Sequence, residues 1–198
     1  MPHPSDSKQH IDQHILPEYA YLPGITPQPA PLSQGSVQDQ TPAAIAAARE
    51  RGRVLFNHGF YWEAHEAWEI AWQDARRKHH EPEARLLKAR IKLAACGVKC
   101  LQRNPAGARH HALRARQLLL SLQEEPDSSC GVSAVELAAL TAFAQKLCEQ
   151  LPEITSRQQS AAHQGGIVIF NPLPRPADHL SFDKEASSPE SRATSEPA

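Results

Sequence analysis

The chain has 198 residues, and its 21 Lys and Arg nearly balance its 22 Asp and Glu, which leaves a formal net charge of −1. The overall charge therefore indicates neither an acidic nor a basic partner, and the length fits one domain with tails. The first twenty residues lack the apolar segment of a secretory signal, and no apolar run approaches the ~20 residues that a membrane helix needs.

Residues 1–40 are polar and rich in proline, so we expect a flexible arm over this range. Within it, segment 17–29 carries apolar residues and a Pro23-Gly24 pair that suits a turn. Two interpretations stay open for this segment: it docks on the folded part of the chain, or it is disordered. The residues that would anchor it are Tyr19, Tyr21, Leu22 and Ile25.

We expect a helical domain over 41–152. Threonine followed by proline is a typical N-cap and first-turn pair, so the first helix should begin at Thr41-Pro42. Gly59 can adopt the left-handed conformation that ends a helix, and a second helix should follow over about 60–77. Apolar residues of the first helix share one face at helical spacing, namely Ile45, Ala48, Gly52, Leu55 and Phe56.

Three further helices are predicted. The third begins near Pro82, and Asn104-Pro105 should end it and start the fourth. Ser133 and Glu136 have the spacing of a capping box for the fifth helix, which Pro152 should end. Since short connections make neighbouring helices antiparallel, we expect an all-α fold, an antiparallel helical bundle of about five helices with flexible tails.

Residues 153–198 should form a mostly disordered C-terminal tail, because their second half is dominated by Ser, Pro, Glu and Ala. Segment 167–170 is the apolar exception, and it can pack against the bundle in an extended form.

The predicted second helix carries all three tryptophans of the chain. Its residues recur at spacings of three, four and seven, which predicts one shared face made of Trp62, His65, Trp68, Glu69 and Trp72. Because each tryptophan can bury a large apolar area, we expect this face to turn inward. Polar groups placed there need partners, since an unpaired buried polar group costs a few kcal/mol.

Two interpretations stay open for His65 and Glu69. They can pair with each other and fix the helix packing, or they can bind a divalent cation such as zinc, iron or manganese, for which imidazole and carboxylate are common ligands. Zinc takes three or four protein ligands, so further ligands would be needed. Candidates are His58, Glu66, His110 and His111. Segment 65–69 also resembles the zinc-protease HExxH helix, but Glu replaces the second His.

Segment 56–72, FNHGFYWEAHEAWEIAW, resembles the signature of the domain of unknown function 309 family, in which HxxxExx is followed by Trp or Tyr. In this chain the motif is His65, Glu69 and Trp72, and its neighbours Trp62, Glu66 and Trp68 support it. The segments KARIKLAACGVK (88–99) and NPAGARHHALRARQLL (104–119) are similar to the same family.

The similarity covers about 41–120, and it departs from the family at Ala89-Arg90, where Gly-Leu is expected. The resemblance implies an all-helical fold and a metal-binding role for His65 and Glu69. It implies no established reaction.

A basic stretch offers a rival function. Between Arg76 and Arg116 there are twelve Lys or Arg and two acidic residues. A basic helical surface can bind nucleic acid or an acidic protein partner, although no aromatic residue in this stretch suggests stacking on single strands. An ordinary solvent-exposed face, or neutralisation inside the bundle or across a homodimer, would also explain it. One side of the third helix carries Arg85, Lys88, Lys92, Lys99 and Arg103.

The sequence therefore predicts a binding domain. It shows no nucleophile–base pair, phosphate loop or dinucleotide motif, so no catalytic constellation is recognised. The first hypothesis is a metal or small-ligand site on the second helix. The alternative is a basic binding module in which the His–Glu pair is purely structural.

The cysteines and the N-terminal sequence together predict a cytoplasmic protein. No CxxC pair occurs, and the spacing fits neither a disulfide framework nor a zinc ribbon, so we expect free thiols in a reducing compartment. The four are Cys96, Cys100, Cys130 and Cys148.

Overall fold

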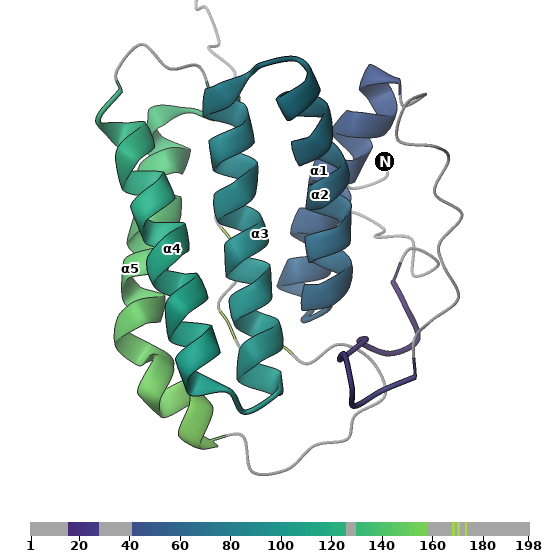
Figure 1. Ribbon diagram of the computed structural model, residues 1–198, viewed down its shortest axis with the longest axis vertical. Coiled ribbons are helices and arrows are strands. Elements are labelled where there is room, and N and C mark those ends of the chain that lie inside the picture. The colour runs from purple at the N-terminus through teal and green to yellow at the C-terminus, as the bar shows by residue number, and fades with distance from the viewer. Residues whose placement is uncertain are drawn as a thin grey trace, which may run out of the picture.

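The computed structural model describes residues 16–27, 41–125 and 130–157, together with residues 168, 170 and 173. Within these ranges the chain forms five helices and no strand, which confirms the predicted all-α fold (Figure 1). None of the described helices is both long and apolar enough to cross a membrane. The helices are α1 (Pro42–Asn57), α2 (Tyr61–Arg77), α3 (Glu81–Leu101), α4 (Pro105–Gln123) and α5 (Ala134–Arg157).

Side-chain caps mark the predicted starts of α1 and α4. The Thr41 hydroxyl accepts a hydrogen bond from the Ala44 N–H at 3.2 Å, and the Asn104 side chain accepts one from the Gly107 N–H at 2.8 Å. Each cap satisfies a backbone donor that has no partner within the helix. Gly59 has φ +81°, so the predicted glycine stop between α1 and α2 is also confirmed.

The start and the end of α5 differ in part from the sequence prediction. The Ser133 hydroxyl accepts from the Glu136 N–H at 3.2 Å, but the Glu136 carboxylate accepts from Arg90 on α3. The prediction that Pro152 ends the helix is wrong, because α5 continues to Arg157 with Pro152 inside it. Leu151, before the proline, is buried, and Ile154, after it, packs on the core. These contacts on both sides of Pro152 offset the loss of the hydrogen bond that proline cannot donate.

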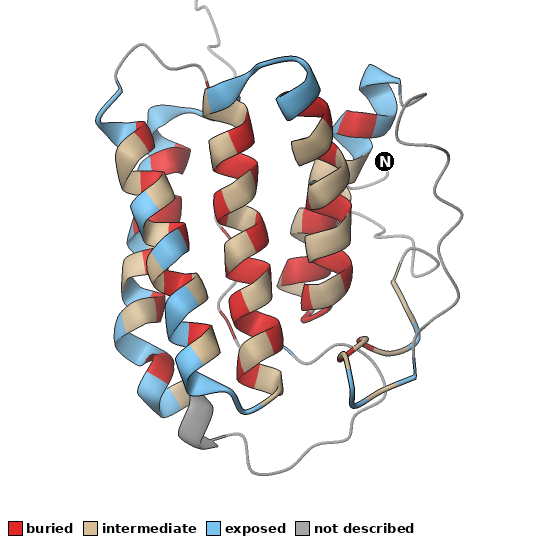
Figure 2. Cartoon of the chain, in the orientation of Figure 1, coloured by how far each residue is buried: buried red, intermediate tan, exposed pale blue. Residues whose placement is uncertain are grey.

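The helices form two layers. Figure 1 shows α2, α3 and α4 side by side, with α1 behind α2 and α5 behind α4. The connections 58–60, 78–80 and 102–104 are short, so consecutive helices run antiparallel. The middle helix, α3, contacts α2, α4 and α5, and Figure 2 shows buried residues along most of its length.

The contact between α1 and α2 depends on Trp68. Its side chain is fully buried, its ring nitrogen donates to the Arg49 carbonyl at 3.1 Å, and its indole packs directly on Gly52. A second pair repeats this arrangement between α2 and α3, where the Tyr61 ring packs on Gly97. In both places glycine allows an aromatic ring to lie against the neighbouring helix backbone.

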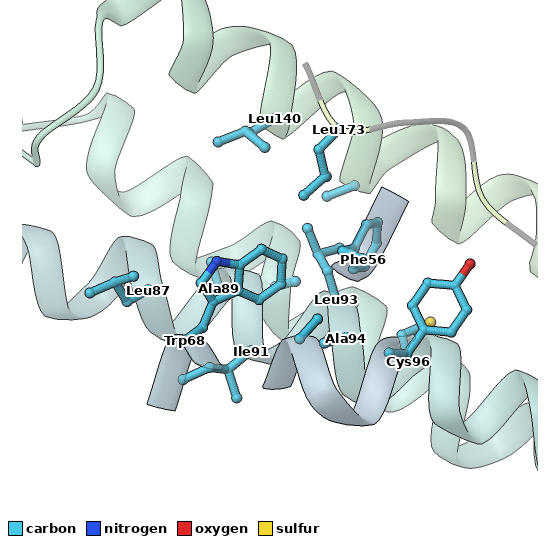
Figure 3. Packing of buried hydrophobic residues seen from close by; sticks show 14 of the residues in the cluster. Phe56, Trp68, Leu87, Ala89, Ile91, Leu93, Ala94, Cys96, Leu140 and Leu173 are labelled. Carbon is cyan, nitrogen blue, oxygen red and sulfur yellow. The ribbon is translucent and has the colours of Figure 1, made fainter. Parts of the chain in front are cut away.

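Two residues near the C-terminus complete the core between α1 and α5. The Phe170 ring stacks on Phe56 of α1 at a centroid distance of 5.8 Å and lies 6.4 Å from Phe143 of α5. Its N–H donates to the Tyr61 hydroxyl, and the Leu173 N–H donates to a side chain of α1. Figure 3 shows Leu173 pointing into the same interior as Leu140 and Phe56. The predicted packing of 167–170 is therefore confirmed for Phe170, while residues 167 and 169 lie outside the described ranges.

Of the two interpretations of segment 17–29, the structure supports docking for residues 16–27. Ala20 is buried as part of the core cluster and Leu22 is also buried, whereas Ile25 is 62% exposed. Residues 28 and 29 lie outside the described ranges. The flexibility expected for 1–40 and 153–198 concerns mostly residues that the structure does not describe, so it stays a prediction.

We expect Gly52→Ala to destabilise the protein by about 1–3 kcal/mol, because the added methyl group would overlap the Trp68 indole and force the helices apart. Chemical denaturation measures this change. Ala46→Leu is the matched control, since Ala46 is exposed on the same helix and its enlargement should change stability by less than about 0.5 kcal/mol. Equal stability of the Gly52→Ala and unmodified chains would contradict the proposed packing.

We expect Phe170→Ala to cost about 3 kcal/mol in unfolding free energy, because it empties a site enclosed by three aromatic rings. Val168→Ala serves as the control, since Val168 is 57% exposed in the same segment. A similar small effect of both changes, measured by denaturant unfolding, would show that the C-terminal segment adds nothing to the core.

Candidate metal centre

The face of α2 that meets the core is not the face that carries the predicted motif. Trp68 lies in the core beside small residues, but Trp62 and Trp72 are half-buried, and the side chains of His65 and Glu69 are 25% and 37% exposed. The prediction that one inward face contains all three tryptophans is therefore wrong. The core positions of α2 are occupied by Tyr61, Ala64, Ala67, Trp68, Ala71 and Ala75.

Close helix packing explains this rotation. Alanines at 64, 71 and 75 let α1 and α3 approach α2 more closely than large side chains would. The larger Trp62 and Trp72 are left at the border between core and solvent, where an indole can bury its ring in part. His65 and Glu69 share this border, on the flank next to the core stripe.

Three potential metal ligands gather in one turn of α2. The His65 Nδ1 atom lies 3.5 Å from Glu66 Oε1 and 3.8 Å from Glu69 Oε2. One ligand atom of each residue lies within 4.8 Å of the other two. The Nδ1 atom is shielded from solvent and has no hydrogen-bond partner. The cluster thus combines an unpaired imidazole nitrogen with two carboxylates.

An aromatic ring contacts the cluster, and a second ring with two cations lies further along α2. The Trp62 ring stacks on the His65 ring with a centroid distance of 5.8 Å and an interplanar angle of 14°. Further along the helix, Trp72 contacts both Arg76 and Lys88, whose Nζ lies 4.0 Å from the ring centroid. Burial lowers the pKa of Lys88 and the cation of Lys92 adds to this, while the Glu69 carboxylate opposes it. A cationic edge on α3 therefore borders the acidic cluster.

The other histidines considered as ligands do not belong to this cluster. His58, which caps the end of α1, has its Nδ1 2.8 Å from the Val54 carbonyl of that helix, and the rings of His110 and His111 on α4 contact each other. Among the residues that the structure describes, the cluster consists of His65, Glu66 and Glu69.

One residue of the predicted basic stripe has an acidic partner, and two others contact uncharged side chains. Arg85 pairs with Glu125, Lys88 lies on Trp72, and the Lys99 ammonium donates to Gln102 at 2.8 Å. Lys92 is half-buried, while Arg103 is exposed in a left-handed backbone conformation, φ 55°. Binding of nucleic acid or an acidic protein to this stripe stays a prediction, as does a homodimer.

The fold also pairs charges between helices. Arg90 of α3 donates to Glu136 of α5 at 2.9 Å, and both side chains are largely buried. Together with the Arg85–Glu125 pair, this contact shows that part of the basic excess is neutralised within the bundle.

Sequence spacing gave no signal for Glu63, which is buried although it does not belong to the apolar stripe of α2. One carboxylate oxygen accepts a hydrogen bond from the Tyr21 N–H at 2.8 Å, and the other is shielded without a partner. Burial raises the pKa of Glu63, and the hydrogen bond from Tyr21 opposes the rise. Only the apolar character of segment 17–29 hinted at such a contact.

The described part of the chain is thus a five-helix bundle with an acidic cluster containing one histidine on the flank of α2. Residues 50–111 match the family model for a domain of unknown function, DUF309, so this part of the chain is similar to that family. The matched range begins in α1, ends in α4 and includes the cluster on α2. No curated protein and no solved structure matches the chain.

We expect His111 to make the protein sensitive to mild acid. Burial, with the nearby charges of Lys92, His110, Lys99 and His65, lowers the pKa of His111 from 6.5 to about 4. The unfolded chain takes up this proton near pH 6.5, so the folded state loses stability as the pH falls from there towards 4. Because the ring is only half-buried, the loss from pH 7 to pH 5 should be about 1 kcal/mol.

Denaturant unfolding at pH 7 and pH 5 tests this expectation. His111→Gln should lose less stability than the unmodified chain over this interval, and His110→Gln, which removes only one of the charges beside His111, should change the pH dependence less than His111→Gln does. An unchanged pH dependence in His111→Gln would refute it.

Proposed function

We propose that this protein binds a divalent transition metal ion through His65, Glu66 and Glu69. The observation that carries the proposal is the unpaired, solvent-shielded Nδ1 of His65, which lies within 4.8 Å of an oxygen from each carboxylate. A shielded imidazole nitrogen without a partner costs free energy, and a bound cation would remove this cost.

The separations suit a shared ion better than direct contact. Nδ1 lies 3.5 and 3.8 Å from the two carboxylate oxygens, which is too far for a strong hydrogen bond. Ligands that each lie about 2.0–2.2 Å from one zinc ion are roughly 3–4 Å from one another. If His65 and Glu69 formed a purely structural pair, we would instead expect a direct hydrogen bond, shorter than these separations.

The ligand types define the class of metal. One imidazole and two carboxylates fit zinc, iron or manganese, and they would balance the charge of a divalent ion. Structural zinc sites are usually closed by four protein ligands, whereas three ligands leave a position for water or a small ligand. The partial exposure of His65 and Glu69 supports this open type of site.

We place the protein in the cytoplasm as part of the same proposal. All four cysteines are free, and three of them are buried. Free buried thiols are usual in a reducing compartment, which supports this location.

We expect untagged protein purified without chelators to carry near-stoichiometric metal by plasma mass spectrometry, and His65→Ala to carry almost none. Adding the same metal should raise the melting temperature of the unmodified chain and not that of His65→Ala. An ion that binds only the folded state, present at a free concentration of a hundred times its Kd, stabilises that state by about 2.7 kcal/mol.

His80→Ala is the matched control, because His80 also lies near a carboxylate, that of Glu83 at 3.6 Å, without a second acidic neighbour in a cluster. It should keep the metal content of the unmodified chain. Equal metal content in His65→Ala, or no metal and no stabilisation by added zinc, iron or manganese in any of the chains, would reject the site.

A further inference from the structure

The N-terminal segment 16–27, here called the arm, docks where α2 begins and α3 ends. These ends lie together because the two helices are antiparallel, and Figure 1 shows the arm beside them at the lower end of the bundle. The Tyr21 N–H donates to Glu63 at 2.8 Å, and the Gln102 side chain donates to the Pro23 carbonyl at 3.0 Å. The arm therefore bonds to α2 and to the residue that caps the end of α3.

The arm has its own compact turn, which makes it a defined structural unit. The Leu22 carbonyl accepts from the N–H groups of Ile25 and Thr26 at 2.9 and 3.0 Å, and the Thr26 hydroxyl accepts from the Leu22 N–H at 2.8 Å. Gly24, with φ +79°, allows the chain to reverse there. Ala20, which belongs to the core cluster, then holds this segment against the helices.

A continuous series of rings joins the arm to the metal-binding cluster. The edge of the Tyr21 ring meets the Trp62 ring at a centroid distance of 5.3 Å and an angle of 86°. The Trp62 ring stacks in turn on His65. Trp62 thus lies between the arm residue Tyr21 and the His65 imidazole. The Nδ1 atom of this imidazole is the one that faces the carboxylates of Glu66 and Glu69.

We propose that the arm is a functional part of the metal site: by holding Trp62 against His65, it fixes the imidazole plane and keeps Nδ1 directed at Glu66 and Glu69. This inference rests on the proposed metal site. An imidazole free to rotate about its side-chain bonds loses conformational freedom on binding an ion, and a ring held in place beforehand avoids part of that loss. Tyr21 and Trp62 are then positioning residues for the ligand His65.

Such coupling is reciprocal. If arm docking strengthens metal binding by some factor, metal binding must strengthen arm docking by the same factor. The ion should therefore reduce the opening of the arm, although no residue of the arm belongs to the cluster. A merely structural role of the arm would not produce this response.

The first test is a calorimetric titration of untagged full-length chains with zinc. Tyr21→Ala should raise the zinc Kd at least about fivefold, the lower end for coupled sites. Tyr21→Phe keeps the ring that meets Trp62 and should restore the affinity of the unmodified chain, and Ile25→Ala, at an exposed position of the same arm, should leave it unchanged. The titration of His65→Ala measures the background zinc binding by the other histidines of the chain.

The second test is hydrogen–deuterium exchange of peptides that cover residues 16–27. Zinc should slow their exchange in the unmodified chain and not in His65→Ala. If zinc binding depends on His65 but Tyr21→Ala binds as tightly as the unmodified chain, and zinc leaves exchange of the arm unchanged, the coupling is refuted while the metal site stands. If the unmodified chain binds no more zinc than His65→Ala, the metal site itself is refuted, and this inference with it.

Discussion

The rotation of α2 about its own axis is set by the contact between the Trp68 indole and the Gly52 backbone. The ring is fully buried, and its single donor is satisfied by the Arg49 carbonyl, so this orientation fills the space between α1 and α2 and leaves no polar atom of the indole unpaired. A different rotation would break that hydrogen bond and open a cavity. Because a helix turns as a unit, the same contact decides that His65 and Glu69 lie at the border with solvent.

The rest of the bundle follows from close approach at small residues. Gly97 accepts the Tyr61 ring, and alanines line the core side of α2, so α3 can lie between two pairs of helices and be buried along most of its length. The antiparallel order then brings the start of α2 next to the end of α3, where the arm docks. At the seam between α1 and α5, the bundle needs Phe170 and Leu173, which come from outside the five helices.

These packing constraints determine the ligand positions, the solvent exposure and the charge of the proposed metal centre. All three of its ligands come from one turn of one helix, so the backbone of α2 fixes their relative positions, while Trp62 supports the imidazole from one side. Partial exposure lets an ion enter and leaves room for a further ligand. Lys88, held over Trp72 on the adjacent helix, places a cation near Glu69, so the site joins an acidic cluster to a basic edge.

The sequence by itself determined the helices, most of their limits and the family resemblance, because caps, glycine stops and apolar spacing act within a few residues of the chain. It also identified His65 and Glu69 as candidates from their spacing and motif, but it offered Glu66 only as one of four possible further ligands, and the structure places Glu66 beside them. It failed at Pro152, where core contacts of Leu151 and Ile154 outweigh a local helix breaker, and at the inward face of α2. Spacing shows which residues share a face of a helix, but the direction in which that face points depends on which side chains fit against the neighbouring helices.

Only the tertiary structure could decide that Trp68 enters the core while Trp62 and Trp72 remain at its border. It also decided that Glu63 is buried beneath a contact with the arm and that Phe170 completes the core. Each of these contacts joins segments far apart in the chain, so no local pattern predicts it.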